Sequence, residues 1–310
     1  MVEKTLKEHM DRLADEDQPV KYSGLVGLTD MTPEMVNDFS MMWPTICDER
    51  RLEIVTKLTE LSEENLELDF TEILHMLLRD QNAAVRELAV QGLWESSDRR
   101  SIRPLVDLLR EDTSIKVRAA AGLTLRRFAN LAQSGKLIAR DVDCVRDGLI
   151  FVIQRPEEDI EVRRRAIEAI SSFDFPELDD IIIDAYRSGD PILVQSAIFA
   201  MGQSSKAKWM PTVLAEIEGD NPAVRYEAAI ATGLLGEQSD VPDIIRLLGD
   251  EDYEVQTAAV RSLGIIGGNL AKQALLQCRQ SGDEVIRDAA IEALELLEFD
   301  EDPLGFKFAT

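Results

Sequence analysis

The chain has 310 residues, of which 45% are hydrophobic and 30% charged, so it should fold, as two domains or as an array of repeats. Its 59 acidic and 34 basic residues give a net charge of −25, which repels phosphate backbones and anionic lipid headgroups. This charge argues against binding to nucleic acids and to membranes.

The first 32 residues are polar and irregular except for one amphipathic helix, which we expect to cap the first repeat. The apolar residues of that helix are Leu6, Met10 and Leu13. The N-terminus has no apolar run after a basic start, so no signal peptide is predicted. The longest apolar stretch, residues 148–153, is far too short to cross a bilayer. We therefore expect a soluble, cytoplasmic protein.

From residue 33 to residue 298 the sequence repeats itself. Residues 220–236 and 251–267 both follow the pattern acidic-x-x-x-Val-Arg/Gln-x-x-Ala-x-x-small-x-Gly-x-x-Gly. The Ala column of this pattern, which should pack in the core, is occupied by Ile54, Ala89, Ala121, Ala166, Ala197, Ala228, Ala259 and Ala290. The last four steps of this column are 31 residues each. This regularity predicts eight copies of one structural unit.

Each copy is predicted to be a short helix, A, followed by a longer helix, B, that begins near the Val-Arg pair. In residues 241–249, Pro242 suits the first turn of helix A and Gly249 suits its C-terminal cap. The acidic residues expected to cap helix B are Asp112, Asp190, Asp220 and Asp250. No stretch alternates with a period of two, so we predict an all-α fold, a right-handed α-α solenoid of about eight helix pairs.

Two features depart from the regular array. One step of 45 residues contains an insertion of about 14 residues, from Phe128 to roughly Asp141, which we expect to form a loop at the edge of the solenoid. The segment 299–310 is acidic and contains Pro303 and Gly305, which end helical order. The predicted organisation is a capping segment at 1–32, a solenoid at 33–298 and an acidic tail at 299–310.

The repeat pattern resembles the HEAT-repeat superfamily, and more closely the short HEAT-like repeats of phycobilisome bilin lyases. Residues 220–236 and 250–267 carry this likeness most clearly. The resemblance implies a hydrogen-bonded ladder between repeats, made by the Asp of the turn and the Arg of helix B. The Arg column holds Arg51, Arg86, Arg118, Arg163, Arg225 and Arg287. Val194 and Gln256 replace arginine in it, so we expect the ladder to be interrupted there.

Motifs that carry chemistry are missing from the sequence. His9 and His75 have no Glu or second His at metal-ligand spacing, and the three cysteines are far apart without a C-x-x-C motif. The repeated His-Glu pairs of deoxyhypusine hydroxylase, a HEAT-repeat di-iron enzyme, do not occur. No phosphate-binding Gly-Lys loop and no G-x-S-x-G elbow is present. We predict no catalytic residue, no metal and no cofactor.

The B-helix positions that vary between copies indicate a binding surface. If the Arg column is position 0, positions +1, +5 and +8 vary freely and share one helical face, which we expect to line the inner, concave surface. The predicted partner-binding residues on this face are Trp94, Leu123, Arg126, Arg164, Gln195, Phe199, Tyr226, Ile230 and Arg261. The alternative is that Phe199 and Ile230 only fill gaps between adjacent B helices.

These observations predict a non-catalytic scaffold or adaptor that binds a protein partner along the concave face and acts as a monomer. The alternative function is that of a bilin-lyase-like or other HEAT-repeat protein that handles a small ligand. A deep, enclosed pocket would favour the ligand, and a long, open groove would favour the protein.

Overall fold

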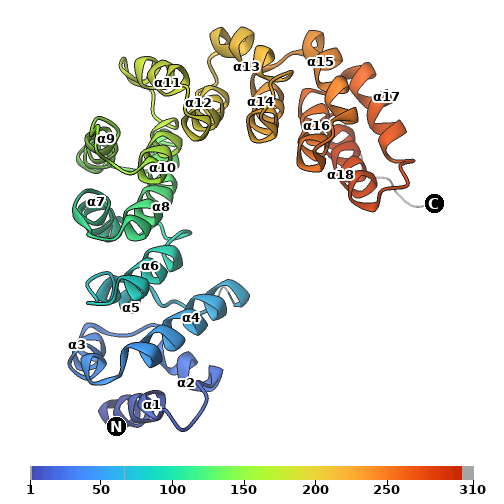
Figure 1. The fold of residues 1–310 in the computed structure, drawn as a ribbon. Helices are drawn as coiled ribbons and strands as arrows, with labels where there is room; N and C mark the ends of the chain where they lie inside the picture. The colour runs from blue at the N-terminus through green and yellow to red at the C-terminus, as the bar shows by residue number, and fades with distance from the viewer. Residues whose placement is uncertain (1, 66, 302–310) are drawn as a thin grey trace. The chain divides into compact units, whose positions relative to one another are not determined.

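The computed structural model describes residues 2–65 and 67–301, and every regular element in these two stretches is a helix (Figure 1). The predicted all-α solenoid of helix pairs is confirmed. The A helices are α3 (Pro33–Met42), α5 (Thr71–Leu77), α7 (Ile102–Glu111), α9 (Ala139–Ile153), α11 (Leu178–Arg187), α13 (Met210–Glu216), α15 (Val241–Arg246) and α17 (Gly268–Cys278). The B helices are α4 (Asp48–Glu64), α6 (Ala83–Gly92), α8 (Ile115–Gln133), α10 (Ile160–Ile170), α12 (Pro191–Gln203), α14 (Pro222–Leu235), α16 (Tyr253–Ile266) and α18 (Glu284–Glu301).

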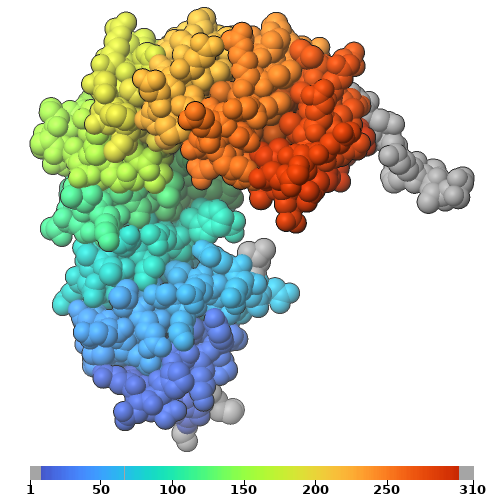
Figure 2. Space-filling view, turned by 45° about the vertical axis from the view of Figure 1, so that its right-hand side comes forward, coloured from blue at the N-terminus to red at the C-terminus, as the bar shows by residue number. Residues whose placement is uncertain are grey.

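The chain divides into two compact units, residues 1–170 and residues 171–310. In the first unit the B helices α4, α6, α8 and α10 pack one against the next, and in the second unit α12, α14, α16 and α18 do the same. Within each unit the repeats follow one another without gaps in the space-filling view (Figure 2). The solenoid limits at residues 32 and 298 stay predictions.

The repeated column forms the core of both units. All eight residues of the column, from Ile54 to Ala290, have no exposed surface. Small residues suffice there because each B helix packs closely against both its own A helix and its neighbouring B helices. Proline at the first turn of α12 and α14 starts these helices where a free amide would otherwise lack a partner.

The described part of the N-terminal segment holds two α-helices, α1 (Val2–Ala14) and α2 (Tyr22–Leu25), and one 3-10 helix, Val26–Leu28. Met10 and Leu13 of α1 are buried, as an amphipathic capping helix requires, and α1 contacts α2 and α3. The side chain of Leu6 lies outside the described residues, and so does the predicted acidic tail from residue 302 onward.

The insertion does not form the loop that we predicted. Instead, its residues lengthen two helices: α8 has 19 residues and α9 has 15, compared with 14 in α14 and 6 in α15. Phe128, the first residue of the insertion, is fully buried in α8. The extra residues carry apolar side chains at helical spacing, so burial favours continued helix over an exposed loop.

The capping prediction is right for one turn and wrong for three. Asp190 accepts hydrogen bonds from the amides of Ile192 and Leu193 at the start of α12. At Asp112, Asp220 and Asp250 the helix starts two or three residues later, so another residue occupies the N-cap position. The N-cap residues there are Ser114, Asn221 and Asp252.

Asp112 and Asp250 serve a different purpose, because each accepts two hydrogen bonds from the arginine of the preceding B helix. Arg86 Nε and Nη2 lie 2.7 and 2.8 Å from the carboxylate of Asp112. Arg225 Nε and Nη2 both lie 2.8 Å from that of Asp250. Two further pairs link neighbouring repeats in the same way: Arg51 with Asp80, and Arg118 with Glu158. These four pairs are called the ladder below.

The ladder is interrupted at Gln256, as expected. Among the described residues it is also missing at Arg163, whose Nε has no partner, and at Arg287, which lies near Asp288 of its own helix, although arginine in the column predicted a ladder pair at both. Gln256 Nε2 donates to the carbonyl oxygen of Asp250 at 2.6 Å. This bond is the equivalent, one repeat later, of the bond that Arg225 Nη1 makes with the carbonyl oxygen of Gly219. A neutral amide cannot form the ion pair with the next repeat. That link is made instead by Tyr253, whose hydroxyl donates to Asp283 at 2.9 Å.

Because of the ladder, the free energy of unfolding should depend on pH in the acidic range. The hydrogen bonds from Arg225 lower the pKa of Asp250 below its ordinary value, against the opposing effect of burial, and the Asp252 amide adds to the lowering. Because the unfolded carboxyl takes up a proton first, at about pH 3.9, this stabilisation is complete above that pH and is lost as pH falls through the folded pKa. Urea unfolding at pH 6 and pH 3 should show that the advantage of wild type over Asp250→Asn is smaller at pH 3. An advantage of equal size at both pH values would contradict this.

Candidate functional site

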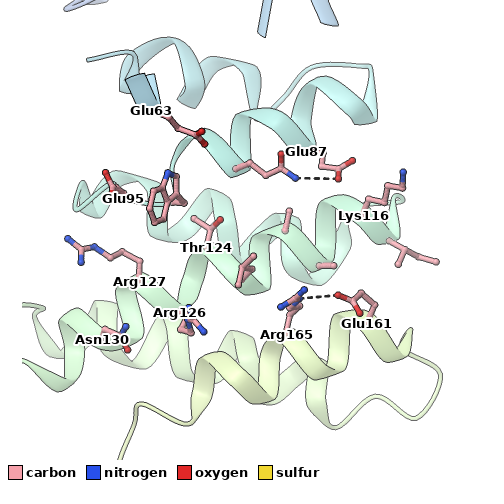
Figure 3. Close-up of a pocket in the computed structure, with 16 residues that line it drawn as sticks. Glu63, Glu87, Glu95, Lys116, Thr124, Arg126, Arg127, Asn130, Glu161 and Arg165 are labelled. Carbon is pink, nitrogen blue, oxygen red and sulfur yellow. Dashed lines mark hydrogen bonds and ion pairs between the residues drawn. The ribbon is translucent and has the colours of Figure 1, made fainter. Parts of the chain in front are cut away.

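A groove with a volume of about 1000 Å³ runs along the B helices of the first unit (Figure 3). Its middle is formed by α8, with Ala119, Ala120 and Leu123 facing the open space. Trp94, two residues after the end of α6, also lines the groove and is 54% exposed. Leu123 is 40% exposed. The groove therefore presents a large aromatic and a large aliphatic group to solvent on a floor of small residues.

All six residues at positions +1, +5 and +8 of α6 and α8 line this groove. They are Glu87, Gln91, Trp94, Ala119, Leu123 and Arg126. The structure thus brings the predicted residues Trp94, Leu123 and Arg126 to one surface. Their role in binding stays a prediction.

The two walls of the groove carry opposite charges. Glu87 of α6, together with Glu63 and Glu95, lies on one side of the space, and Arg126 and Arg127 of α8 lie on the other (Figure 3). Variation between repeats did not predict Glu95 and Arg127, which occupy position +9. Position +9 lies four residues after +5 and so shares its helical face. This spacing could have identified Glu95 and Arg127 as lining residues.

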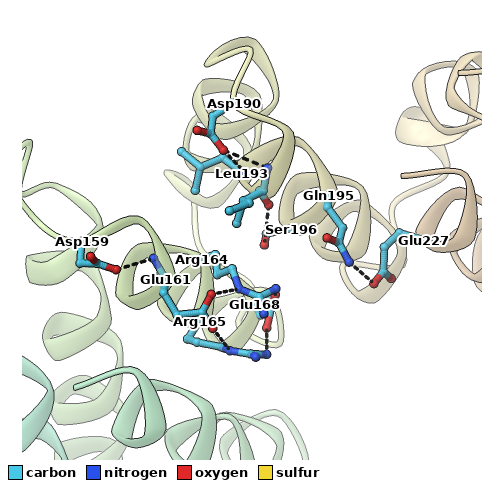
Figure 4. Close-up of polar contacts among 11 residues, drawn as sticks. Asp159, Glu161, Arg164, Arg165, Glu168, Asp190, Leu193, Gln195, Ser196 and Glu227 are labelled. Carbon is cyan, nitrogen blue, oxygen red and sulfur yellow. Dashed lines mark hydrogen bonds and ion pairs between the residues drawn. The ribbon is translucent and has the colours of Figure 1, made fainter. Parts of the chain in front are cut away.

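Arg164 does not line the groove, but its neighbour Arg165 does. Both arginines bond the same two carboxylates on α10 (Figure 4). Arg164 Nε lies 2.6 Å from Glu161, and Arg164 Nη1 lies 3.1 Å from Glu168. Burial tends to raise the pKa of Glu161, but the hydrogen bond from Arg164 and the two positive charges lower it overall. The charge of Arg164 is thus balanced on its own helix.

Trp94 also lines a second hollow, of about 790 Å³. Glu72, Asp98 and Arg100 line this hollow, and Arg100 bonds both carboxylates. Trp94 is therefore shared by the two depressions.

Comparison with known proteins identifies the repeats. The sequence matches the family of HEAT repeats over residues 70–144 and 210–295, which together make up just over half of the chain. The chain belongs to the HEAT-repeat family. The first matched segment includes α6 and α8, which form the groove. No curated protein matches the chain in sequence.

Several solved HEAT-like structures are similar to this chain. The complex of CpcE and CpcF of phycocyanin lyase from Nostoc sp. PCC7120 has a TM-score of 0.50 at 18% identity, over 74% of this chain and 93% of that chain. YibA of Escherichia coli has a TM-score of 0.47 at 14% identity, over 93% and 95%. Human deoxyhypusine hydroxylase has a TM-score of 0.37 at 16% identity, over 96% and 97%. The first of these similarities supports the fold alone.

The remaining predicted residues lie on the B helices of the HEAT repeats in the second unit. Gln195 of α12 donates to Glu227 of α14 at 3.3 Å (Figure 4). Phe199, Tyr226 and Ile230 are half-buried, and Arg261 is exposed. Half-burial fits both a packing role and a binding role, so these residues stay proposed.

Position +8 of α12, α14 and α16 is a packing position, which corrects the expectation that it lines the surface in these repeats. Gly202, Gly233 and Gly264 hold this position and are buried. A Cβ atom on Gly233 would lie 2.7 Å from Ser262 Oγ of the next B helix, and one on Gly264 would lie 2.8 Å from Ala293 Cβ. Glycine is needed there because the B helices approach each other closely.

Within residues 2–65 and 67–301, no cluster of three or more His, Cys, Asp or Glu side chains could hold a metal ion. His75 makes one short bond, 2.6 Å from Nε2 to the buried Ser101 hydroxyl, and burial lowers its pKa. This contact ties α5 to the start of α7. In the same described stretches, no helix is both long enough and apolar enough to cross a membrane.

Proposed function

We propose that this HEAT-repeat chain is a non-catalytic scaffold that holds a segment of a partner protein in the groove of the first unit. The observation that carries this proposal is the exposure of Trp94 and Leu123 over an open groove. Large exposed apolar groups reduce solubility, so an exposed patch of them marks a binding site. Tryptophan beside arginine is the usual composition of a binding hot spot. The open form of the groove favours a protein segment over an enclosed small ligand.

The groove also limits the kind of segment that fits. Its apolar floor suits one or two large apolar anchors, while the walls offer carboxylates on one side and guanidinium groups on the other. A segment with an apolar centre and charges of both signs would pair with both walls. Two copies of this chain would repel each other because each carries a net charge of −25, which supports the monomeric state.

Changing Trp94 and Leu123 to alanine should abolish partner binding without unfolding the protein. If both are anchors, each should contribute about 1–3 kcal/mol to binding. Because both side chains are exposed, unfolding should shift by no more than about 0.5 kcal/mol. The partner can be identified with a photo-crosslinking amino acid at position 123, and the purified partner then titrated into wild type and variant. The exposed Ile138, outside the groove, gives the matched control Ile138→Ala.

Tryptophan fluorescence gives a direct readout. The chain has three tryptophans, of which Trp43 and Trp209 are buried and Trp94 is exposed. Partner binding should therefore shift the emission to shorter wavelength and protect Trp94 from acrylamide, and neither effect should occur in Trp94→Phe. Equal affinity of wild type and the double alanine variant would place the partner elsewhere. A chain purified with a bound chromophore would favour the ligand-handling alternative.

A further inference from the structure

The second unit carries an exposed row of aliphatic side chains at one position of three successive B helices. The row consists of Leu234 on α14, Ile265 on α16 and Leu296 on α18, and these side chains are 44%, 53% and 59% exposed. They are 31 residues apart and each lies nine residues after the ladder position. We call these three residues the aliphatic row. It is separate from the groove and does not rest on the function proposed above.

The packing register shows that the three side chains occupy equivalent places on successive helices. Gly233 faces Ser262 on the next helix, and Gly264 faces Ala293 in the same way, so the step from α14 to α16 is repeated from α16 to α18. The residues of the row follow directly after Gly233, Gly264 and Glu295. Packed helices lie about 8–10 Å apart, so the row extends over roughly 20 Å.

Packing accounts for these aliphatic groups only in part: Leu234 Cδ1 would lie 3.6 Å from a Cβ atom on Gly202 of α12, but the three residues of the row remain 44%, 53% and 59% exposed. In the repeats of α6, α8 and α12 the same position holds Glu95, Arg127 and Gln203, so the fold accepts polar residues there. Three consecutive exposed aliphatic residues at one register cost solubility, and surfaces of this kind serve as binding sites.

The charges beside the row indicate what covers it. The surface positions +1, +5 and +8 of α18 are Asp288, Glu292 and Glu295, all exposed, while Arg261 is the basic residue at these positions in α14, α16 and α18. Residues 171–310 contain 26 acidic and 10 basic side chains. A second copy of this chain or an anionic membrane would be repelled. A cationic partner would be attracted.

We propose that the aliphatic row binds a cationic amphipathic helix of a partner protein. A helix rises about 1.5 Å per residue, so apolar residues seven apart are about 10.5 Å apart, close to the spacing of the B helices. Such a helix, lying across α14, α16 and α18, places one apolar anchor against each member of the row. Its lysine or arginine side chains then pair with the carboxylates of α18.

The test uses the full chain and a labelled 21-residue amphipathic peptide with leucine on one face and lysine on the other. Fluorescence anisotropy should show binding that weakens at least about tenfold in Ile265→Ser with Leu296→Ser, since both anchors are lost and no charge changes. The matched control is Leu270→Ser on α17, which is 46% exposed and lies outside the row, with an expected change under about twofold. Glu292→Gln with Glu295→Gln should weaken binding about threefold and reduce its salt dependence.

Three outcomes would overturn the proposal. The first is unchanged affinity for the lysine peptide in the folded double serine variant, checked by circular dichroism. The second is equal affinity for a peptide with glutamate in place of lysine. The third is loss of binding in Trp94→Ala with the serine variant unaffected, which would place the peptide in the first unit's groove and leave the function proposed above intact.

Discussion

Replacing Asp112 by alanine should destabilise the first unit by about 3–5 kcal/mol, because it leaves the guanidinium of Arg86 without its partner in a mostly buried position. The Asp112 side chain is 4% exposed and accepts two hydrogen bonds from Arg86 and one from the Ser114 amide. Burial alone would raise the pKa of Asp112, but these bonds outweigh it and lower the pKa. The carboxylate is therefore charged at neutral pH, and the pair is intact.

Urea unfolding can be followed separately in the two units. Trp43, which donates to Asp80 at 2.6 Å, reports on the first unit, and Trp209 reports on the second. The control is Glu157→Ala, which removes a mostly exposed partner of Arg155 and should cost no more than about 1 kcal/mol. Arg86→Met with Asp112→Leu should recover most of the loss, since neither charge then remains buried alone. If Asp112→Ala costs no more than Glu157→Ala, the ladder does not stabilise the repeats.

The second large effect is expected from Gly264→Val, which should destabilise the second unit by about 3 kcal/mol. A Cβ atom at this position lies 2.8 Å from Ala293 Cβ and 3.1 Å from Ala293 Cα. The neighbour is therefore helix α18 itself and not the end of a flexible side chain, so α16 and α18 must move apart. The gain in helix propensity over glycine, about 0.5 kcal/mol, is too small to offset this.

The control for Gly264 is Gly249→Ala, because a Cβ atom at Gly249 meets nothing within 4 Å. This change should leave stability unaltered or raise it by up to about 1 kcal/mol. Gly264→Ala should destabilise the unit less than Gly264→Val does. Adding Ala293→Gly to either variant should restore part of the lost stability, because it removes the Cβ atom that the new side chain meets. Unfolding followed through Trp209 decides between the outcomes, and a Gly264→Val variant as stable as wild type would mean that α18 is not held against α16.

The period of the sequence predicted the fold well because one period corresponds to one helix pair. Ala228 and Ala259 had to be small for the helices to approach, and their recurrence every 31 residues placed them in the core. The interruption of the ladder followed equally directly from Gln256, which carries no charge. The prediction of a loop for the insertion that begins at Phe128 was wrong, because a count of extra residues does not distinguish a loop from two lengthened helices.

The part of the candidate site formed by large side chains on the varying helical face could be predicted from the sequence. Trp94 and Leu123 fall on the varying face and line the groove. Position +8 shows the limit of that argument, since it holds exposed Trp94 in α6's repeat but buried Gly264 in α16. The distance between neighbouring B helices determines which of the two occurs, and variation between repeats does not report that distance.

The hydrogen bond from Tyr253 to Asp283, which links the last two repeats in place of an ion pair, has a consequence for local unfolding of the array. Each repeat contacts its neighbours, so local opening depends on the strength of each junction. At the junction of α16 and α18 the ion pair is replaced by the phenol of Tyr253 on Asp283, which is exposed. We therefore expect fraying to start at this end, with the amide hydrogens of α17 and α18 exchanging with solvent before those of α14. The last helix pair behaves as a detachable end piece, and the aliphatic row loses Leu296 whenever that piece opens.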